Sequence, residues 1–424
     1  MAAVLSKVVE RRLVEVVRRR MEVEAVVVLE GPRSVGKSTL LRCLAEPWRS
    51  EIIDLDDLAT RDAARADPAL LVTGEAPVAI DEFQHAPELL DAIKAELNRD
   101  GSPGRFVLTG STRYATLPAT AQALTGRAHR ISVLPLSQGE AAEKHEDFAE
   151  LLVRDPSSLV SRRPLPGSRP DYISRVVAGG FPPALRRVRS ADRARWFDDY
   201  LDLVLGRDVL EISRVQQRRQ LPLLLRGLAS QTGQILNIAK TAAVIGMEKS
   251  TAESYVKLLE AVFLVNQLPA WGTTLGSRVG SAPKIHIVDS GLAARLLRLT
   301  ESKLSEASAS ALTQLGHLLE TFVVGEVSKQ LDWLDEPVAR GHWRTHDGDE
   351  VDLVLEREDG RVAAVEVKAT SRIGPGQLRP LVKLSRRLGR QFLGAVVLYT
   401  GARAYTDENG IHVVPLARLW QASE

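Results

Sequence analysis

Short apolar runs alternate with a segment of helical periodicity in the first part of the chain. Runs rich in β-branched residues cover residues 25–30, 77–80 and 105–110, and they are of the kind that forms strands buried on both faces. Residues 39–45 have the spacing of an amphipathic helix. Strands that alternate with helices predict an α/β domain built on a parallel sheet.

The hydrophobic pattern changes along the rest of the chain. Turn-forming residues dominate 154–170 and mark a boundary. Helical spacing then returns, and beyond residue 221 short helical segments are followed by strand-like ones. The last part combines an amphipathic helix with several strand-like segments. We therefore expect an α/β domain at 1–153, a linker and helical lid-like segment at 154–220, a winged helix-turn-helix domain at 221–299 and a small α/β domain at 300–424.

Composition excludes several classes of protein. The 424 residues include 56 Lys and Arg against 54 Asp and Glu, so the net charge of +2 leaves only local patches for nucleic-acid contacts. The single cysteine, Cys43, excludes an internal disulfide and a cysteine-based zinc site. No apolar run approaches the roughly 18 residues of a membrane-spanning helix. We expect a cytoplasmic protein without a membrane partner.

A glycine-rich loop follows the first apolar run directly. Gly31 and Gly36 let the backbone wrap closely around phosphates, and amides at the start of the next helix point at the anion. In such a loop Lys37 reaches the β and γ phosphates, and the Ser38 hydroxyl binds Mg²⁺. We therefore expect ATP and Mg²⁺ as cofactors. The candidate nucleotide-binding residues are Gly31, Pro32, Arg33, Ser34, Val35, Gly36, Lys37, Ser38 and Thr39.

Polar residues after the two other apolar runs complete the predicted nucleotide site. Asp81 would bind Mg²⁺ directly or through a water ligand, and Glu82 would act as the base that activates water. Thr109 and Ser111 are candidate sensors that position the water, with an ordinary polar strand end as the alternative. Arg127 is a candidate donor to the γ-phosphate, in cis or from a neighbouring subunit, or else a surface arginine.

A helix-turn-helix pattern follows in the middle of the chain. Residues 237–245 predict one helix, and a capping-box pattern at 250–253 opens a second, expected to reach residue 264. The Gly- and Ser-rich stretch 272–282 is the expected wing between two strands. Such a module places its second helix in the DNA major groove, and a protein-packing or oligomerisation module is the alternative. The candidate DNA-binding residues are Lys249, Thr251, Ser254, Lys257, Arg278 and Lys284.

Three charged residues near the C-terminus form a candidate metal site. Asp352, Glu366 and Lys368 stand in the order Asp…Glu-x-Lys, with thirteen residues between the two acids. Two carboxylates in this order can hold Mg²⁺ against a scissile phosphate, while the ammonium group orients water and stabilises developing charge. A degenerate module whose charges form salt bridges is the alternative.

The turn between the two acids constrains this candidate site. A strict two-residue hairpin at Asp359-Gly360 would set Asp352 opposite Val367, on the other face of the sheet from Glu366. A metal site therefore requires a bulge or an odd-length loop, and we predict a bulge or break near Asp352. A regular ladder that points Asp352 away from Glu366 would exclude the metal site.

The motifs together resemble a known family. They are Gly31-Pro-Arg-Ser-Val-Gly-Lys-Ser38, Leu55-Asp-Asp57, Ile80-Asp-Glu-Phe-Gln84, Leu108-Thr-Gly-Ser111, Gly126-Arg127, Leu134-Pro-Leu-Ser137, Gly179-Gly-Phe-Pro-Pro183, Trp196, Tyr200 and Arg207-Asp208. They resemble prokaryotic AAA+ ATPases in which an ATPase domain, a winged helix and a nuclease-like module of unknown function follow one another. Because AAA+ sites usually complete at subunit interfaces, the resemblance implies a homo-oligomer such as a hexameric ring.

The C-terminal acid pattern resembles that of the PD-(D/E)XK nuclease superfamily. In archaeal Holliday-junction resolvases of this fold, a helical glutamate four residues after a glycine adds a metal contact; Gly316 and Glu320 match this spacing, and Glu326 is the weaker alternative. The resemblances imply an ATPase that couples hydrolysis to DNA binding and remodelling, with branched DNA such as Holliday junctions as the expected partner. An ATP-dependent regulatory switch or toxin-like protein that acts through protein contacts is the alternative.

Overall fold

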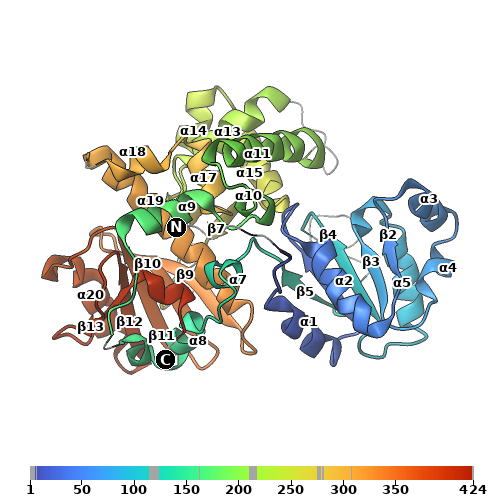
Figure 1. The fold of residues 1–424 in the computed structure, drawn as a ribbon, viewed down its shortest axis with the longest axis horizontal. Helices are drawn as coiled ribbons and strands as arrows, with labels where there is room; N and C mark the ends of the chain where they lie inside the picture. Colours follow the sequence, from blue (N-terminus) through green and yellow to red (C-terminus); the bar gives the residue numbers. More distant parts are fainter. Residues whose placement is uncertain are drawn as a thin grey trace.

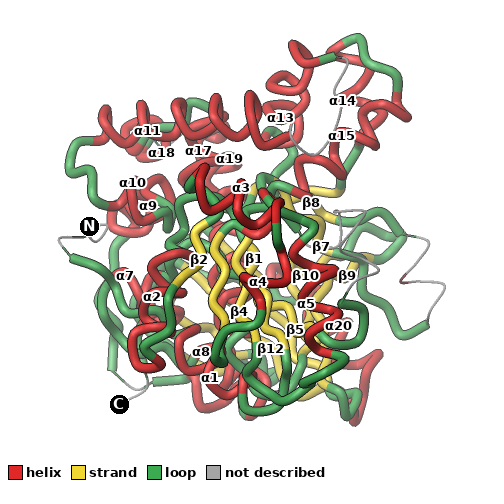
Figure 2. The backbone as a smooth tube through the Cα atoms, turned by 90° about the vertical axis from the view of Figure 1, so that its right-hand side faces the viewer, coloured by secondary structure: helices red, strands yellow, loops and turns green. Residues whose placement is uncertain are grey.

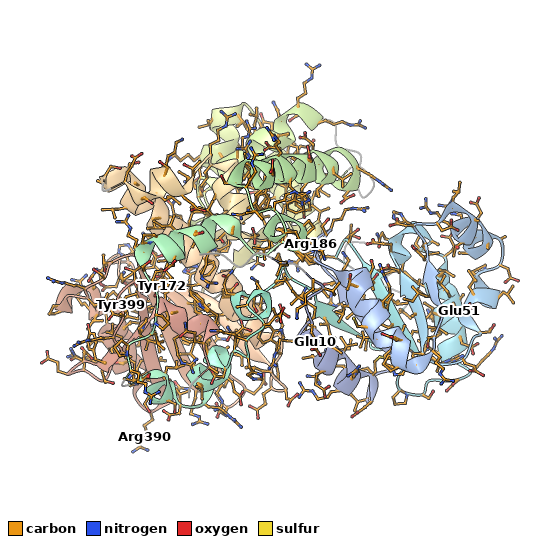
Figure 3. All side chains as sticks on the ribbon, in the orientation of Figure 1. Glu10, Glu51, Tyr172, Arg186, Arg390 and Tyr399 are labelled. Atoms are coloured by element: carbon orange, nitrogen blue, oxygen red, sulfur yellow. The ribbon has the colours of Figure 1, made fainter. Side chains whose placement is uncertain are left out.

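Three β-sheets organise the chain. The computed structural model describes residues 5, 7–113, 124–161, 163–209, 217–274, 278, 281–306 and 308–422. Figure 1 shows a five-stranded sheet with its helices at one end of the molecule, and the other two sheets with the remaining helices at the other end. In Figure 3, Glu10 and Arg186 lie between the two ends, whereas Glu51 lies on the outer side of the N-terminal domain. Among the described helices, none has the length and apolar character needed to cross a membrane.

The N-terminal sheet is parallel, as the sequence predicts. Its strands are β1 (Val26–Glu30), β2 (Ile52–Asp54), β3 (Val78–Asp81), β4 (Phe106–Gly110) and β5 (Ala128–Ser132), in the order β2-β3-β4-β1-β5. Every pairing in this sheet is parallel. The carboxyl ends of the strands therefore lie at one edge, where the loops after β1, β3 and β4 meet.

Helices cover both faces of this sheet. They are α1 (Leu13–Met21), α2 (Lys37–Trp48), α3 (Leu58–Ala66), α4 (Pro68–Val72) and α5 (Leu89–Leu97). Successive residues of β1 alternate between two cores: Val27 and Leu29 pack with α1 and α2, while Val26 and Val28 pack with α3 and α5. Figure 2 shows the strands between α2 on one side and α5 on the other.

Helices dominate the middle of the chain. They are α7 (Gln138–Ala141), α8 (Phe148–Arg154), α9 (Arg169–Ala178), α10 (Pro182–Leu185), α11 (Ser190–Leu203), a π-helical turn at Val204–Asp208, α13 (Leu221–Ala229), α14 (Ile238–Ile245), α15 (Lys249–Ala261), α17 (Ser290–Leu296) and α18 (Glu301–Ser305).

The aromatic side chains of α11 serve packing. Rings contact one another among Phe181, Trp196, Phe197 and Tyr200.

A small antiparallel sheet follows the helix-turn-helix segment. Its strands are β6 (Gln234–Ile235), β7 (Val265–Leu268) and β8 (Lys284–Ile287), in the order β6-β8-β7. The predicted capping box is wrong, because α15 already begins at Lys249 and Ser250 lies inside its first turn. The helix also ends at Ala261, before the predicted residue 264, because Phe263 adopts a left-handed backbone conformation with φ 58°.

The C-terminal sheet mixes antiparallel and parallel pairs. Its strands are β9 (Val338–Arg344), β10 (Glu350–Arg357), β11 (Val362–Lys368), β12 (Phe392–Tyr399), β13 (Tyr405–Thr406) and β14 (His412–Pro415), in the order β13-β14-β12-β11-β10-β9. The long helix α19 (Ala309–Leu331) packs on Leu353 and Val365, whereas α20 (Arg379–Leu388) packs on Val354 and Ala364. The two helices therefore cover opposite faces of the sheet.

Helix α8 packs outside the domain to which the sequence assigns it. We expected the ATPase domain to extend to residue 153, but α8 contacts α19 and strands β11 and β12 of the C-terminal sheet. The amide of Ala149 donates to Gln330 Oε1 at 3.0 Å, and Arg357 donates to the Val153 carbonyl at 3.1 Å. The reason is the apolar face of α8, which includes the buried Phe148 and is covered by the C-terminal domain.

A buried charged junction joins the N-terminal domain to α19. Glu326 of α19 accepts a hydrogen bond from the Gln138 amide at 2.7 Å and one from Lys329 at 2.6 Å. Lys329 also donates to the Leu136 carbonyl at 3.0 Å. The carboxylate and the ammonium group thus compensate each other inside the protein, and both hold the segment that leaves β5.

Glu146 adds a second carboxyl group to this junction. Its Oε1 accepts a hydrogen bond from the Gly139 amide at 2.6 Å, while Oε2 is buried without a hydrogen-bond partner. Burial, and then repulsion from Glu326, raise the pKa of Glu146 to about 8. The side chain therefore carries a proton at neutral pH.

The raised pKa of Glu146 predicts a pH-dependent stability. The folded chain binds a proton that the unfolded chain releases above about pH 4.5, so the free energy of unfolding should fall between that pH and about pH 8. Glu146→Gln should remove this loss and stabilise the protein at pH 8.5 by roughly 2–5 kcal/mol more than at pH 5. Urea unfolding at both pH values measures the difference. Glu150→Gln, on the exposed side of α8, is the control; equal behaviour of the two variants would contradict the assignment.

Candidate functional site

The loop between β1 and α2 adopts a phosphate-binding shape. A Cβ atom on Gly31 would lie 2.1 Å from the Val133 carbonyl oxygen, so only glycine allows this close approach to the neighbouring strand end. Gly36 and Ser34 have φ angles of 96° and 64°, which turn the backbone so that α2 starts at Lys37. Residues 31–39, the predicted nucleotide-binding residues, thus form one loop and the first turn of α2.

Lys37 lies inside this loop. Its ammonium group donates to the carbonyl oxygens of Gly31 and Pro32 at 3.1 and 3.0 Å and lies 3.9 Å from the Glu82 carboxylate. Burial lowers the pKa of Lys37, although the negative charge of Glu82 opposes the shift. The Lys37 ammonium group is therefore poorly hydrated and can bind an anion.

Ser38, Asp81 and Thr109 form a hydrogen-bonded group beside the loop. The Thr109 hydroxyl donates to Asp81 Oδ1, and the Glu82 amide donates to Thr109 Oγ1 at 3.1 Å. Burial raises the pKa of Asp81, while hydrogen bonds from Thr109 and Ser38 oppose this rise. One carboxylate and one hydroxyl side by side are oxygen donors of the kind that suits Mg²⁺. The sequence-predicted magnesium ligands are therefore adjacent.

Glu82 is held in a fixed orientation next to Lys37. Its backbone has a left-handed conformation with φ 54°, and its carboxylate accepts a hydrogen bond from the Gln84 amide group, which also donates to Ser111 at 3.0 Å. Burial alone would raise the pKa of Glu82, but the positive charges of Lys37 and Arg33 and the hydrogen bonds from Gln84 and Ser111 together hold it below the ordinary value. The side chain is therefore an ionised carboxylate. The sequence did not assign a role to Gln84.

Arg127 lies outside this site in its own chain, so the prediction of a γ-phosphate contact in cis is wrong, and the alternative of a surface arginine fits its exposed position. It precedes β5, whose first residue Ala128 pairs with Val26, the first residue of β1. Arg127 therefore lies at the amino edge of the parallel sheet, opposite the phosphate loop, where its side chain donates to Asn98 Oδ1 at 2.7 Å. The motif shows that a glycine-arginine pair lies near a strand. It does not show whether that part of the chain lies at the carboxyl edge of the sheet, beside the phosphate loop, or at the amino edge.

Two arginines at the loop make contacts that the sequence did not predict. Arg11 donates to the Val35 carbonyl at 2.9 Å and forms a buried ion pair with Glu140 at 3.0 Å. Arg33, expected to bind nucleotide, forms an ion pair of 2.7 Å with Asp208 of the π-helical turn. The Arg11–Glu140 pair and the Arg33–Asp208 pair each join segments more than 100 residues apart. Only the Arg207-Asp208 motif pointed to this region.

The strand geometry around Asp352 meets the condition set by the sequence. Strand β10 pairs with β11 in a regular register, Leu353 opposite Val365, and the register with β9 shifts between Val351 and Val354. The predicted bulge at Asp352 is therefore confirmed, on the β9 side. The turn to β11 is an odd-length loop, and the Asp352 carboxylate accepts a hydrogen bond from the Val367 amide at 2.9 Å.

The three C-terminal acids lie together but do not form a metal centre. Glu320 of α19 and Asp352 both contact the ammonium group of Lys284, at 2.7 and 3.0 Å. Glu366 is 2.5 Å from Lys368. Burial, and then repulsion from Asp352, raise the pKa of Glu366 to about 8. Within the described ranges, no group of three or more His, Cys, Asp or Glu side chains is arranged to hold a metal ion.

Two of the predicted DNA-binding residues have carboxylate partners within the protein. Lys284 is fully buried among carboxylates, and Arg278 forms an ion pair with Glu356 of the C-terminal sheet at 2.8 Å. The prediction of Lys284 as a phosphate contact is therefore wrong, because its buried charge is compensated by distant carboxylates, whereas Arg278 is partly exposed and stays a prediction. Residues 275–277, 279 and 280 of the predicted wing at 272–282 lie outside the described residues.

The other four DNA-binding candidates lie on α15. Lys249, Ser254 and Lys257 are exposed, and Thr251 is half-buried. Lys249 also forms an ion pair of 3.4 Å with Glu253 one turn along the helix. The exposed side of α15 therefore offers two cations and one hydroxyl group.

Three family models match the chain in succession. Residues 23–142 match an AAA domain, residues 169–303 match a domain of unknown function (DUF8612), and residues 315–419 match another domain of unknown function (DUF4143). The first match contains the phosphate loop, Asp81, Glu82 and Thr109. Together with the parallel sheet, it defines the N-terminal domain as an ATP-binding P-loop ATPase domain of the AAA type.

Similar proteins add little on function. Uncharacterized proteins of Mycobacterium tuberculosis and Mycobacterium bovis are each 28% identical over 411 residues, which is 95% of this chain and 82% of theirs. A Walker-type ATPase of Pyrococcus abyssi is 14% identical with a TM-score of 0.41, over 70% of this chain and 98% of that one. AMPPCP-bound DnaA from Aquifex aeolicus is 12% identical with a TM-score of 0.28, over 58% of this chain and 86% of that one. These TM-scores are too low for either structure to bear on this chain's activity.

The close approach at Gly31 predicts that a methyl group there destroys the nucleotide site. In Gly31→Ala the new Cβ would overlap the Val133 carbonyl, so the loop must move away from β5 and lose its fit to phosphate. We expect ATP affinity to fall at least about tenfold, as measured by titration with a fluorescent ATP analogue. Gly74→Ala is the control, because its Cβ would meet its nearest atom at 3.8 Å. Equal affinities of the two variants would refute the geometry.

Proposed function

We propose that the protein hydrolyses ATP at the loop between β1 and α2 and uses this reaction to act on DNA. The convergence of Lys37, Asp81 and Glu82, all buried at the carboxyl edge of the parallel sheet, carries the proposal. Three charged groups at this edge of a largely apolar domain are costly without a charged ligand, and a nucleotide with Mg²⁺ supplies one.

Each residue of the site has a role in the proposed mechanism. Glu82 accepts the proton of the attacking water, because it is ionised and its carboxylate is fixed by Gln84. Lys37 stabilises the negative charge that develops on the phosphate oxygens. Ser38 and Asp81 would hold Mg²⁺, which neutralises phosphate charge when bound. Thr109 orients the Asp81 carboxylate by its hydrogen bond.

The element order of the middle region supports a DNA-binding role. Helices α13, α14 and α15 are followed by strands β7 and β8, which is the order of a winged helix. Exposed Lys249 and Lys257 on α15 supply cations for the phosphate backbone. Two cations and few other polar groups favour binding without sequence specificity, which fits a branched or end-bearing DNA substrate.

Arg113 supports coupling between ATP and DNA. It lies two residues beyond Ser111, and its amide donates to the Ala261 carbonyl at 2.9 Å. Its side chain donates to the Glu260 carbonyl at 2.9 Å, and its guanidinium lies 4.7 Å from the centre of the Phe263 ring. A movement of the β4 tip during hydrolysis would therefore displace the end of α15.

We also propose a homo-oligomer, in which a neighbouring copy donates an arginine to the ATP site. The candidate Arg127 lies at the opposite edge of the sheet, and Arg33 in the loop is paired with Asp208. An AAA-type site completed in trans supplies the missing donor. Light scattering of Glu82→Gln with ATP should give a mass several times that of one chain; a monomer under these conditions would reject the oligomer.

An ATP-dependent regulatory switch is the second candidate function. Arg278 and Lys284, two residues expected to contact DNA, instead join the middle region to the C-terminal domain. This internal use of cations favours protein contacts over DNA contacts. ATPase rates measured with and without forked or four-way DNA separate the two functions, because a switch would show no stimulation by DNA.

Two variants test the ATP site directly. Lys37→Ala removes the cation that binds phosphate, so ATP binding and hydrolysis should both be lost. Glu82→Gln keeps the shape but removes the base, so hydrolysis should fall about 100-fold or more while ATP binding is retained. Phosphate release and ATP titration measure the two steps. Glu51→Gln, at an exposed position of the same domain, is the control. Unchanged hydrolysis in Glu82→Gln would reject Glu82 as the base.

A double variant tests the DNA surface. Lys249→Ala/Lys257→Ala should weaken binding to all DNA sequences alike and reduce the slope of log affinity against log salt by about 2, because each lysine contacts one phosphate. Fluorescence anisotropy over a salt series measures this slope with four-way and linear duplexes. Lys7→Ala/Lys303→Ala, which removes two exposed cations elsewhere, is the matched control. No DNA binding by the wild type at low salt would favour the switch.

A further inference from the structure

A buried lysine occupies the centre of the C-terminal acidic cluster. The Lys284 ammonium group lies 2.7 Å from Glu320 Oε1, 2.5 Å from Glu350 Oε1 and 3.0 Å from Asp352 Oδ1. The ammonium group donates hydrogen bonds to Glu320 and Asp352, and Glu350 adds an ion-pair contact. The side chain is fully buried. Carboxyl groups of the protein itself therefore surround the Lys284 ammonium group.

The lysine comes from a different part of the chain than the carboxylates. Lys284 begins β8, the central strand of the small sheet, whereas Glu320 lies on α19 and the other two acids lie on β10. Backbone hydrogen bonds fix this arrangement: the Trp271 amide donates to the His342 carbonyl at 2.6 Å, and the His342 amide returns a bond of 2.9 Å to the neighbouring segment. The small sheet is thus attached to β9, beside the cluster.

The remaining acid of the cluster also has a cationic partner. Lys368 lies 2.5 Å from Glu366, the third acid of the predicted nuclease pattern. Two ammonium groups therefore face the carboxylates that the pattern assigns to Mg²⁺. A divalent ion bound by Glu320 and Asp352 would occupy the point where the Lys284 nitrogen lies, because metal–oxygen distances of about 2.0–2.6 Å leave no room for both cations.

We propose that Lys284 takes the place of the divalent cation in the C-terminal domain, so that the site binds Mg²⁺ or Mn²⁺ only when this ammonium group is removed. In the wild type, the buried ion cluster of Lys284 with these carboxylates attaches the small sheet to the C-terminal domain. The inference does not rest on the proposed ATPase or DNA-binding function.

Mn²⁺ titration of the full nucleotide-free chain tests the proposal on the folded wild type. The wild type and Asp352→Asn should take up the same amount of Mn²⁺, because the carboxylate is already engaged by Lys284. Any binding near Asp81 is present in both proteins and cancels in the comparison. A Mn²⁺ site in the wild type that Asp352→Asn removes would overturn the proposal.

Variants of Lys284 provide the positive test. Lys284→Gln should gain Mn²⁺ affinity of at least about tenfold over the wild type, and Lys284→Gln/Asp352→Asn should lose the gain. Mn²⁺ should also raise the melting temperature of Lys284→Gln but not that of the wild type. Lys284→Arg retains a cation and should resemble the wild type, and Lys257→Gln controls for the loss of one positive charge. A folded Lys284→Gln without the new Mn²⁺ site would refute the proposal. If Lys284→Gln does not fold, the comparison of Mn²⁺ uptake by the wild type and by Asp352→Asn tests the proposal instead.

Discussion

Buried charge is tolerated inside a protein only where a partner compensates it, and in this chain several of the partners come from distant segments. Lys284 is paired with carboxylates of α19 and β10, and Glu326 of α19 accepts a hydrogen bond from the segment after β5. Arg33 of the phosphate loop is paired with Asp208 of the helical region. Removal of one partner would leave a buried charge alone, at a cost of about 3–5 kcal/mol. The successive domains therefore depend on one another for stability.

Arginine side chains with partners in distant segments also link the ATP site to the rest of the molecule. Arg11 supports the loop through the Val35 carbonyl and is itself paired with Glu140, next to the buried junction with α19. On the opposite side of the site, Arg113 ties the tip of β4 to the end of α15. Hydrogen bonds of the main chain and of arginine side chains therefore join the ATP site to the other domains.

Sequence patterns predicted the local features of this protein and missed the non-local ones. The parallel sheet, the phosphate loop and the adjacent Ser38 and Asp81 follow from apolar runs and motif spacing, which are properties of neighbouring residues. The bulge at Asp352 also followed, because strand register can be counted along the chain. The roles of Lys284, Arg278 and Arg127 did not follow, because each depends on which distant segment or sheet edge lies beside the side chain.

Lys37 and Lys284 show how surroundings decide the role of one residue type. Both ammonium groups are buried, but Lys37 is held mainly by two neutral carbonyl oxygens, with Glu82 at 3.9 Å. Lys284 is held by three carboxylates at 3.0 Å or less. A phosphate group can replace neutral acceptors around a cation because its charge interacts more strongly with the ammonium group. It cannot replace the three carboxyl groups around Lys284 without leaving them unpaired in the interior, so Lys37 is able to bind a ligand whereas Lys284 stabilises the fold.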